Sequence, residues 1–356
     1  MKLKTLLLGS AAAFAVVGGA QAADLSVAEP VEYVKACEAF GAGFFYLPGS
    51  DTCLQITGHA EFDANFHTNS FLYSGSPSNH SASWDFQTSG GVYFDAKSMT
   101  DVGVLEGNFG IKGTYDGAGN STVYLDGAYV KLGALKAGHF GSTFNPSTDY
   151  NDVDFGISNP TKSSLADSNH LELSFKAGGV GLALGIEDPR ESFGSNLPTN
   201  YSLPLIDGNI TFGGSNVSAF ISGGFTQVNG AGGSNSWGVD GELTFNLGSM
   251  DSIRVNGAYG DNPFIGGGAG TGVAMGYNNG WSAFASLQHY FSKTLRTDWT
   301  IGYLDYAGST SVTRTNVAGD LVWLPYTGFR AKAGVIWTST SSTNSWAAQV
   351  ALRRDW

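Results

Sequence analysis

One stretch of the sequence, "FGSTFNPSTDYNDVDFGISNP" (residues 140–160), places three carboxylates within six positions and intersperses them with large aromatic residues. Its carboxylates are those of Asp149, Asp152 and Asp154. Carboxylates so spaced attract cations, and at a protein surface they can also bind a divalent cation. A loop exposed to solvent has no need of large aromatics, whereas a loop folded against an inner wall would pack them. We therefore expect this stretch to fold inward, with an acidic surface loop or a surface cation site as the alternative.

Further charged side chains recur at alternate positions, on the same face as other polar residues. The acids on such faces are Glu61, Asp63, Glu106, Asp240, Glu242 and Asp298. The bases are Lys112, Arg254, Arg296, Arg330, Lys332 and Arg353. Opposite charges across a water-filled passage create a transverse field that orients water and solutes. Alternation shows which face of a strand a residue lies on, but not its position along the passage. Any one of these residues could therefore be ordinary lining of the passage.

Five further residues are expected to form the pore constriction together with Asp149, Asp152 and Asp154. They are His59, Glu61, Lys112, Arg330 and Lys332. The chain lacks the sequence motifs G-x-S-x-G, H-E-x-x-H and C-x-x-C and a phosphate-binding glycine loop, and its six histidines are scattered. We predict a protein that is not an enzyme, with no catalytic residues, no cofactor and no metal.

The elements that must hold these residues have the period of a β-strand. In "CLQITGHAEFDANFH" (residues 53–67), apolar or small residues alternate with polar ones over thirteen positions. The apolar face would meet a protein core in a soluble sandwich, or lipid in an outer-membrane barrel whose polar face lines a lumen. Sixteen such runs, bounded by Gly, Pro, Asn and Ser, are expected. They lie near residues 54–66, 84–97, 101–114, 122–132, 134–140, 170–177, 180–187, 205–213, 216–226, 236–247, 251–260, 280–291, 294–306, 313–324, 328–338 and 345–356.

Two features favour the barrel over the sandwich. Short hinges such as Lys293-Thr294 alternate with long polar stretches such as residues 261–279, which is the layout of outer-membrane barrels. Trp346 and Trp356 lie ten residues apart on one apolar face. In a tilted strand this spacing separates them by roughly 25 Å along the barrel axis. That height matches an apolar band between two aromatic girdles. The predicted fold is an all-β, transmembrane, antiparallel barrel of about sixteen strands.

The N-terminus has the pattern of a secretory signal: Lys2 and Lys4, an apolar run, and a small-x-small site ending at Ala22. Removing residues 1–22 changes the net charge from −12 to −14, which disfavours nucleic acid as a partner. Cys37 and Cys53 are expected to form a disulfide in an oxidising compartment, and a metal pair is the weaker alternative. The predicted organisation is a signal peptide (1–22), an N-terminal periplasmic segment with the disulfide loop (23–53) and a barrel (54–356) that includes the constriction loop (140–160).

The opening segment "PVEYVKACEAFGAGFFYLPGSDTCLQITGH" (residues 30–59) resembles the start of the alphaproteobacterial general-diffusion porins. The resemblance continues more loosely through "YLDGAYVKLGALKAGHFGST", "GWSAFASLQHYFSKTLRTDWTIGY" and the terminal "ALRRDW". It implies a sixteen-stranded barrel that assembles as a homotrimer and lets small hydrophilic solutes diffuse passively, with its third outer loop folded inward. Two positions depart from the family pattern: Trp356 replaces a terminal Phe, and Glu61 stands where an Arg is common.

Together these features predict a porin in the Gram-negative outer membrane, in contact with lipid, that passes small hydrophilic solutes and ions. The charge count favours a weak cation preference, although Glu61 leaves the selectivity inherited from the family open. Two alternatives remain: an outer-membrane barrel hydrolase with a nucleophile and a His at the rim, and a closed structural or adhesive barrel.

Overall fold

The computed structural model describes residues 35–68, 83–116, 119–144, 165–192, 201–228, 234–261, 264, 279–306, 312–340 and 344–356. The expected signal peptide lies outside these ranges, and so do Asp149, Asp152 and Asp154. The statements below concern the described residues.

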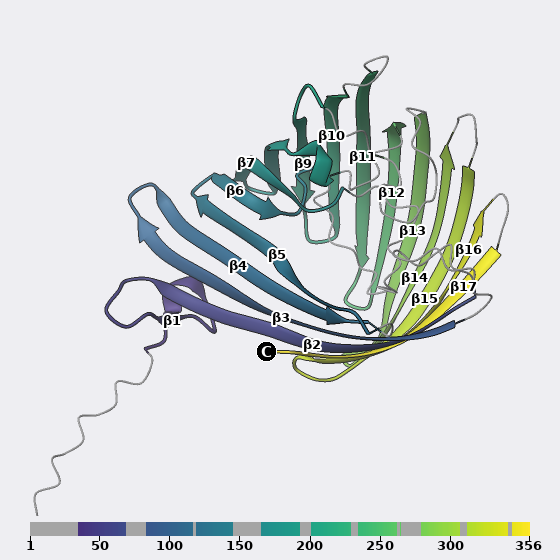
Figure 1. Cartoon of the computed structure of the whole chain (residues 1–356), viewed down its shortest axis with the longest axis horizontal. Coiled ribbons are helices and arrows are strands. Elements are labelled where there is room, and N and C mark those ends of the chain that lie inside the picture. Colours follow the sequence, from purple (N-terminus) through teal and green to yellow (C-terminus); the bar gives the residue numbers. More distant parts are fainter. Residues whose placement is uncertain are drawn as a thin grey trace, which may run out of the picture.

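Sixteen long antiparallel strands form the wall of a closed barrel (Figure 1). In chain order they are β2 (Cys53–His67), β3 (Ser83–Thr100), β4 (Gly103–Tyr115), β5 (Ser121–Leu132), β6 (Leu135–Phe140), β7 (Ser168–Ala177), β8 (Val180–Glu187), β9 (Leu205–Gly213), β10 (Val217–Val228), β11 (Ser234–Leu247), β12 (Asp251–Asp261), β13 (Asn279–Ser292), β14 (Leu295–Tyr306), β15 (Val312–Tyr326), β16 (Phe329–Thr340) and β17 (Asn344–Asp355). Each pairs with the next, and β17 closes the wall against β2, with Gln349 opposite Asn65. The predicted fold class and strand count are confirmed.

The two faces of the wall have the reverse of the polarity found in a soluble protein. Ile221 on β10 is 63% exposed, whereas its neighbour Ser222 is 3% exposed. On β17, Val350 is 53% exposed and the adjacent Gln349 only 3%. Apolar side chains therefore cover the outside and polar ones cover the inside, which suits a wall between lipid and water. A soluble sandwich would bury the first set, so the sandwich alternative is wrong.

Turns of two different lengths join the strands. One end of the barrel has tight connections, in which Gly133 and Gly178 take positive φ values of 57° that favour glycine. The other end carries the long stretches, including the one between β6 and β7. The short helices are η2 (Glu38–Phe40) and α2 (Pro189–Ser192). No helix in the described part of the chain is long and apolar enough to cross a bilayer.

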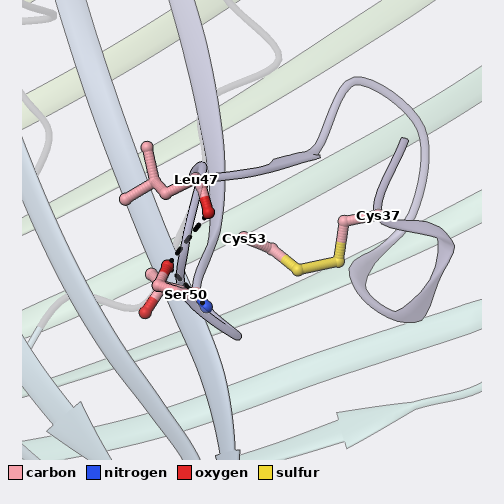
Figure 2. The surroundings of a disulfide bond; sticks show 5 residues. Cys37, Leu47, Ser50 and Cys53 are labelled. Carbon is pink, nitrogen blue, oxygen red and sulfur yellow. Dashed lines mark hydrogen bonds between the residues drawn. A yellow bond between two sulfur atoms is a disulfide. The ribbon is translucent and has the colours of Figure 1, made fainter. Parts of the chain in front are cut away.

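The chain before the barrel folds back onto the start of β2. Cys37 and Cys53 form a disulfide with a Cα–Cα distance of 5.9 Å, as predicted (Figure 2). Both cysteines are buried with Phe44, and the two-residue strand β1 (Phe45–Tyr46) pairs with β2. Because Cys53 is the first residue of β2, the disulfide ties this segment directly to the barrel wall.

The polarity of the wall predicts opposite outcomes for the same substitution at adjacent positions of β7. Leu173 faces outward, and its neighbour Ser174 faces inward opposite the buried Ala183. Leu173→Arg should cost about 2–4 kcal/mol of folding free energy in phospholipid vesicles, because a guanidinium would enter hydrocarbon. Ser174→Arg should cost much less, because its side chain would enter the polar interior. Denaturant titration of both variants measures the difference, and an equal loss would contradict the assigned faces.

Candidate functional site

Barrel closure brings charges from both ends of the chain together on the inner wall. Arg353 on β17 lies directly opposite Glu61 on β2, and Arg330 on β16 lies opposite Arg353. Arg353 Nη1 donates to Glu61 Oε2 at 3.0 Å, and Arg353 Nε donates to Asp355 Oδ1 at 2.8 Å. Arg330 Nη2 lies 3.9 Å from Glu61 Oε1. Glu61 is therefore the shared partner of two arginines.

The remaining candidate bases lie on either side of this group. Lys332 follows Arg330 on the inner face of β16 and is 3% exposed. His59 precedes Glu61 on β2, and its ring stacks on Tyr93 with centroids 6.0 Å apart. Lys112 on β4 is in register with His59 through one residue of β3, and it forms no ion pair within the described ranges. The structure thus brings Glu61 and Arg330 together, with His59 and Lys332 two positions along the same strands and Lys112 on β4 of the same wall.

A second polar site lies where the stretch between β6 and β7 leaves and rejoins the wall. Glu187, the last residue of β8, is 1% exposed and accepts four hydrogen bonds. Ser142 Oγ and the Thr143 backbone N–H donate to Oε1 at 2.9 and 2.7 Å. Ser168 Oγ and Ser192 Oγ donate to Oε2 at 3.1 and 2.8 Å. One buried carboxylate therefore ties both roots of this stretch to α2.

Two more contacts fix the first root to the interior. Thr143 Oγ1 donates to Glu172 Oε2 on β7 at 3.1 Å, and Asn209 Nδ2 on β9 donates to the Thr143 carbonyl at 2.7 Å. The next residue, Phe144, is completely buried. The chain thus turns toward the inner wall at residues 142–144 as it leaves β6. Glu187 was not among the predicted site residues, because a glutamate at a strand end carries no periodic signal.

The surface side of α2 carries a separate, exposed ion pair. Arg190 Nη2 donates to Asp188 Oδ2 at 2.6 Å, and this hydrogen bond lowers the pKa of the Asp188 carboxyl below its ordinary value. Such exposed pairs add little stability. Among the described residues, no group of three or more His, Cys, Asp or Glu is arranged to hold a metal ion.

Comparison with known protein families identifies the family of this chain. The family model of the porin subfamily matches residues 24–354, almost the whole chain. The chain belongs to the porin family. Its relatives place it in the outer membrane of Gram-negative bacteria, as the sequence predicted.

Two curated relatives of this porin are alphaproteobacterial. The outer membrane protein y4fJ of Sinorhizobium fredii is 36% identical over 197 residues, 53% of this chain and 55% of the relative. Porin Omp2b of Brucella suis is 38% identical over 164 residues, 42% of this chain and 44% of the relative. The matched part therefore spans about half the length of these relatives or less.

Solved structures share the fold at low identity. The outer membrane channel DcaP of Acinetobacter baumannii superposes with a TM-score of 0.69 at 15% identity, covering 87% of this chain and 99% of DcaP. OmpT of Vibrio cholerae, in a trimer form, gives a TM-score of 0.58 at 10% identity, covering 86% of this chain and 100% of OmpT. At such identities the likeness concerns the barrel architecture.

The buried carboxylate at the loop roots generates a prediction for the porin's stability. Each carboxylate oxygen of Glu187 accepts two hydrogen bonds. Glu187→Gln would replace one of these oxygens by an amide NH₂, which cannot accept them. We expect a loss of about 1–3 kcal/mol in the free energy of unfolding, because buried donors would lose their acceptor. Denaturant titration by tryptophan fluorescence measures this loss.

Glu191→Gln is the matched control. Glu191 also accepts hydrogen bonds, from Asn169, but its side chain is 38% exposed and water can replace them. The control should lose less than about 1 kcal/mol. Equal stability of the two variants would rule out a special role for Glu187.

Proposed function

We propose that this porin is a passive, water-filled channel for small hydrophilic solutes and ions. The observation that carries the proposal is the closed sixteen-stranded wall with apolar side chains outside and charged and polar side chains inside. Such a wall supplies a hydrated passage through hydrocarbon without any covalent chemistry. Selectivity would then come from the width of the passage and from the charges that line it.

The proposed selectivity filter has two sides. Asp149, Asp152 and Asp154 would form the acidic side, on a loop whose first root turns inward at Thr143. The basic side would be the inner-wall residues His59, Lys112, Arg330 and Lys332, together with Arg353. Glu61 neutralises part of that basic side through its two arginines. Because Glu61 offsets part of the positive charge of the wall, the negative charge of the three aspartates would exceed the remaining positive charge. This excess supports a weak cation preference.

The barrel hydrolase alternative has little support. Ser168 Oγ lies 3.3 Å from His170 Nδ1, which is the contact expected of an activated nucleophile. Both residues are buried, however, and the serine hydroxyl donates to Glu187. A buried hydroxyl engaged in a structural hydrogen bond cannot attack a lipid ester at the rim. Membership of the porin family also favours a channel without enzymatic activity.

We further propose assembly as a homotrimer. The support is the similar fold of OmpT, whose structure is of a trimer form, together with the resemblance of residues 30–59 to trimeric general-diffusion porins.

Planar-bilayer recording tests the channel and the trimer in one experiment. Purified protein should insert in conductance steps and close in three equal substeps, because each protomer would carry its own passage. A lipid-hydrolysis assay on the same sample should show no turnover. A closed structural barrel would give no conductance, and single-step closures would contradict the trimer.

Reversal potentials across a salt gradient test the acidic side of the filter. Asp149→Asn, Asp152→Asn and Asp154→Asn combined should lower the cation-to-anion permeability ratio at least about twofold. One unit charge about 8 Å from a permeating ion in water is worth about 0.5 kcal/mol, which is close to a factor of two.

The matched control removes three acids far from the expected constriction: Glu38→Gln, Asp51→Asn and Asp101→Asn combined. It changes the net charge by the same amount and should leave the ratio nearly unchanged. An unaltered ratio in the loop variant would mean that these aspartates do not line the passage.

A further inference from the structure

An apolar patch interrupts the polar inner wall of the barrel. Leu205 on β9, Ala258 on β12 and Leu304 on β14 are buried on the inner face, where neighbouring positions are polar or charged. Gly224 on β10 and Gly238 on β11 lie between them, directly opposite each other in the strand register. An apolar surface facing water inside a channel is unfavourable unless something covers it.

Two phenylalanines from different connections cover the patch. Phe144 comes from the root that follows β6, and Phe264 comes from the connection that follows β12. Both are 0% exposed, and their rings meet edge to face with centroids 5.2 Å apart and an interplanar angle of 60°. Leu165, at the other root of the same connection as Phe144, belongs to this cluster. We name these three residues and the patch beneath them the aromatic lock.

The glycine pair leaves room for the rings. A Cβ added at Gly238 would lie 2.4 Å from Phe264 Cβ. A Cβ added at Gly224 would lie 2.8 Å from Phe264 Cε1 and 3.2 Å from Phe144 Cδ2. Any side chain at Gly238 would therefore displace Phe264, because the contact is with the fixed base of that side chain.

Phe264 is itself held in place by the end of β12. Its backbone N–H donates to the Asp261 carbonyl at 2.9 Å. Asp261 Oδ2 accepts a hydrogen bond from the Trp237 backbone N–H on β11 at 3.0 Å. Phe264 is thus hydrogen-bonded to the end of β12, whereas Phe144 belongs to the root that follows β6.

We propose that Phe264 is a positioning residue for conduction: seated on Gly238, it holds the ring of Phe144 against Gly224 and so fixes the roots of the β6–β7 connection against the wall. The inference rests on the proposed channel function, because it assigns the lock a role in the size and steadiness of the passage. Hydrogen bonds of the Glu187 group hold the same roots from the other side. The two anchors together would hold the described roots, residues 141–144 and 165–167, against the inner wall.

The experiment compares Phe264→Ala with Phe264→Leu in single-channel recordings. Phe264→Ala should increase brief current fluctuations several-fold and change the mean conductance, because Phe144 loses its cover. Phe264→Leu keeps apolar bulk over the patch and should restore steady current. Gly238→Ala should behave like Phe264→Ala, whereas Gly223→Ala should behave like the parent. Gly223 is the matched control, because a Cβ there would be 3.8 Å from its nearest neighbour.

A second measurement does not depend on conduction. Hydrogen exchange of the backbone at residues 140–144, followed by mass spectrometry, should become faster in Phe264→Ala and Gly238→Ala and stay unchanged in Gly223→Ala. Phe144→Ala should give the same acceleration, and the double variant Phe144→Ala/Phe264→Ala should add nothing to it.

The outcomes separate the two proposals. If the parent barrel does not conduct but exchange responds as expected, the channel function fails and the lock stands as an anchor. If the folded Phe264→Ala barrel has the parent's current noise, conductance and exchange at residues 140–144, the lock is overturned. Independent, additive effects of Phe144→Ala and Phe264→Ala would overturn it as well, because two rings that act as one contact cannot be additive.

Discussion

The hydrogen-bonding demand of the backbone in hydrocarbon governs this structure. A strand edge inside a bilayer would leave N–H and C=O groups without partners at a cost of several kcal/mol each, so the sheet must close. Closure is made by β17 against β2, which are separated by nearly the whole chain. The same pairing sets Arg353 opposite Glu61. The hydrogen-bond ladder that closes the barrel therefore also creates the charged group at the centre of the candidate site.

Closure also divides the side chains into two populations with different solvents. The outer set meets lipid and needs apolar bulk, whereas the inner set must satisfy its polar atoms near water. Glu187 shows how the inner wall does so, since its four donors come from three separate segments. The aromatic lock is a local exception to the inner polarity, and single apolar residues such as Phe220, Phe284 and Val322 are also buried on the inner face. Such an exception is stable only because each of its apolar surfaces covers another.

Features that depend on short stretches of sequence could be predicted, whereas contacts between distant strands could not. Strand number, strand faces and the disulfide follow from a period of two and from two cysteines, and all are confirmed. The Glu61–Arg353 pair was not predicted, because alternation assigns a face while pairing depends on the register of distant strands. Glu187 and Phe264 also escaped prediction: one ends a strand, and the other lies in residues 261–279, a long polar stretch without periodicity. The inward position of Asp149, Asp152 and Asp154 stays a prediction.

Water in the lumen weakens ion pairs on the inner wall, whereas contacts from which water is excluded keep their strength. Ion pairs in contact with water are worth about 0–1 kcal/mol, because solvent competes for both partners. Apolar burial contributes about 25 cal/mol per Å² wherever water is excluded, and a buried carboxylate with four donors resists exchange with solvent. Buried contacts can therefore hold the two roots at residues 141–144 and 165–168 when the salt concentration changes. Charged side chains of the inner wall that contact water would then act mainly on the permeating ions and solutes.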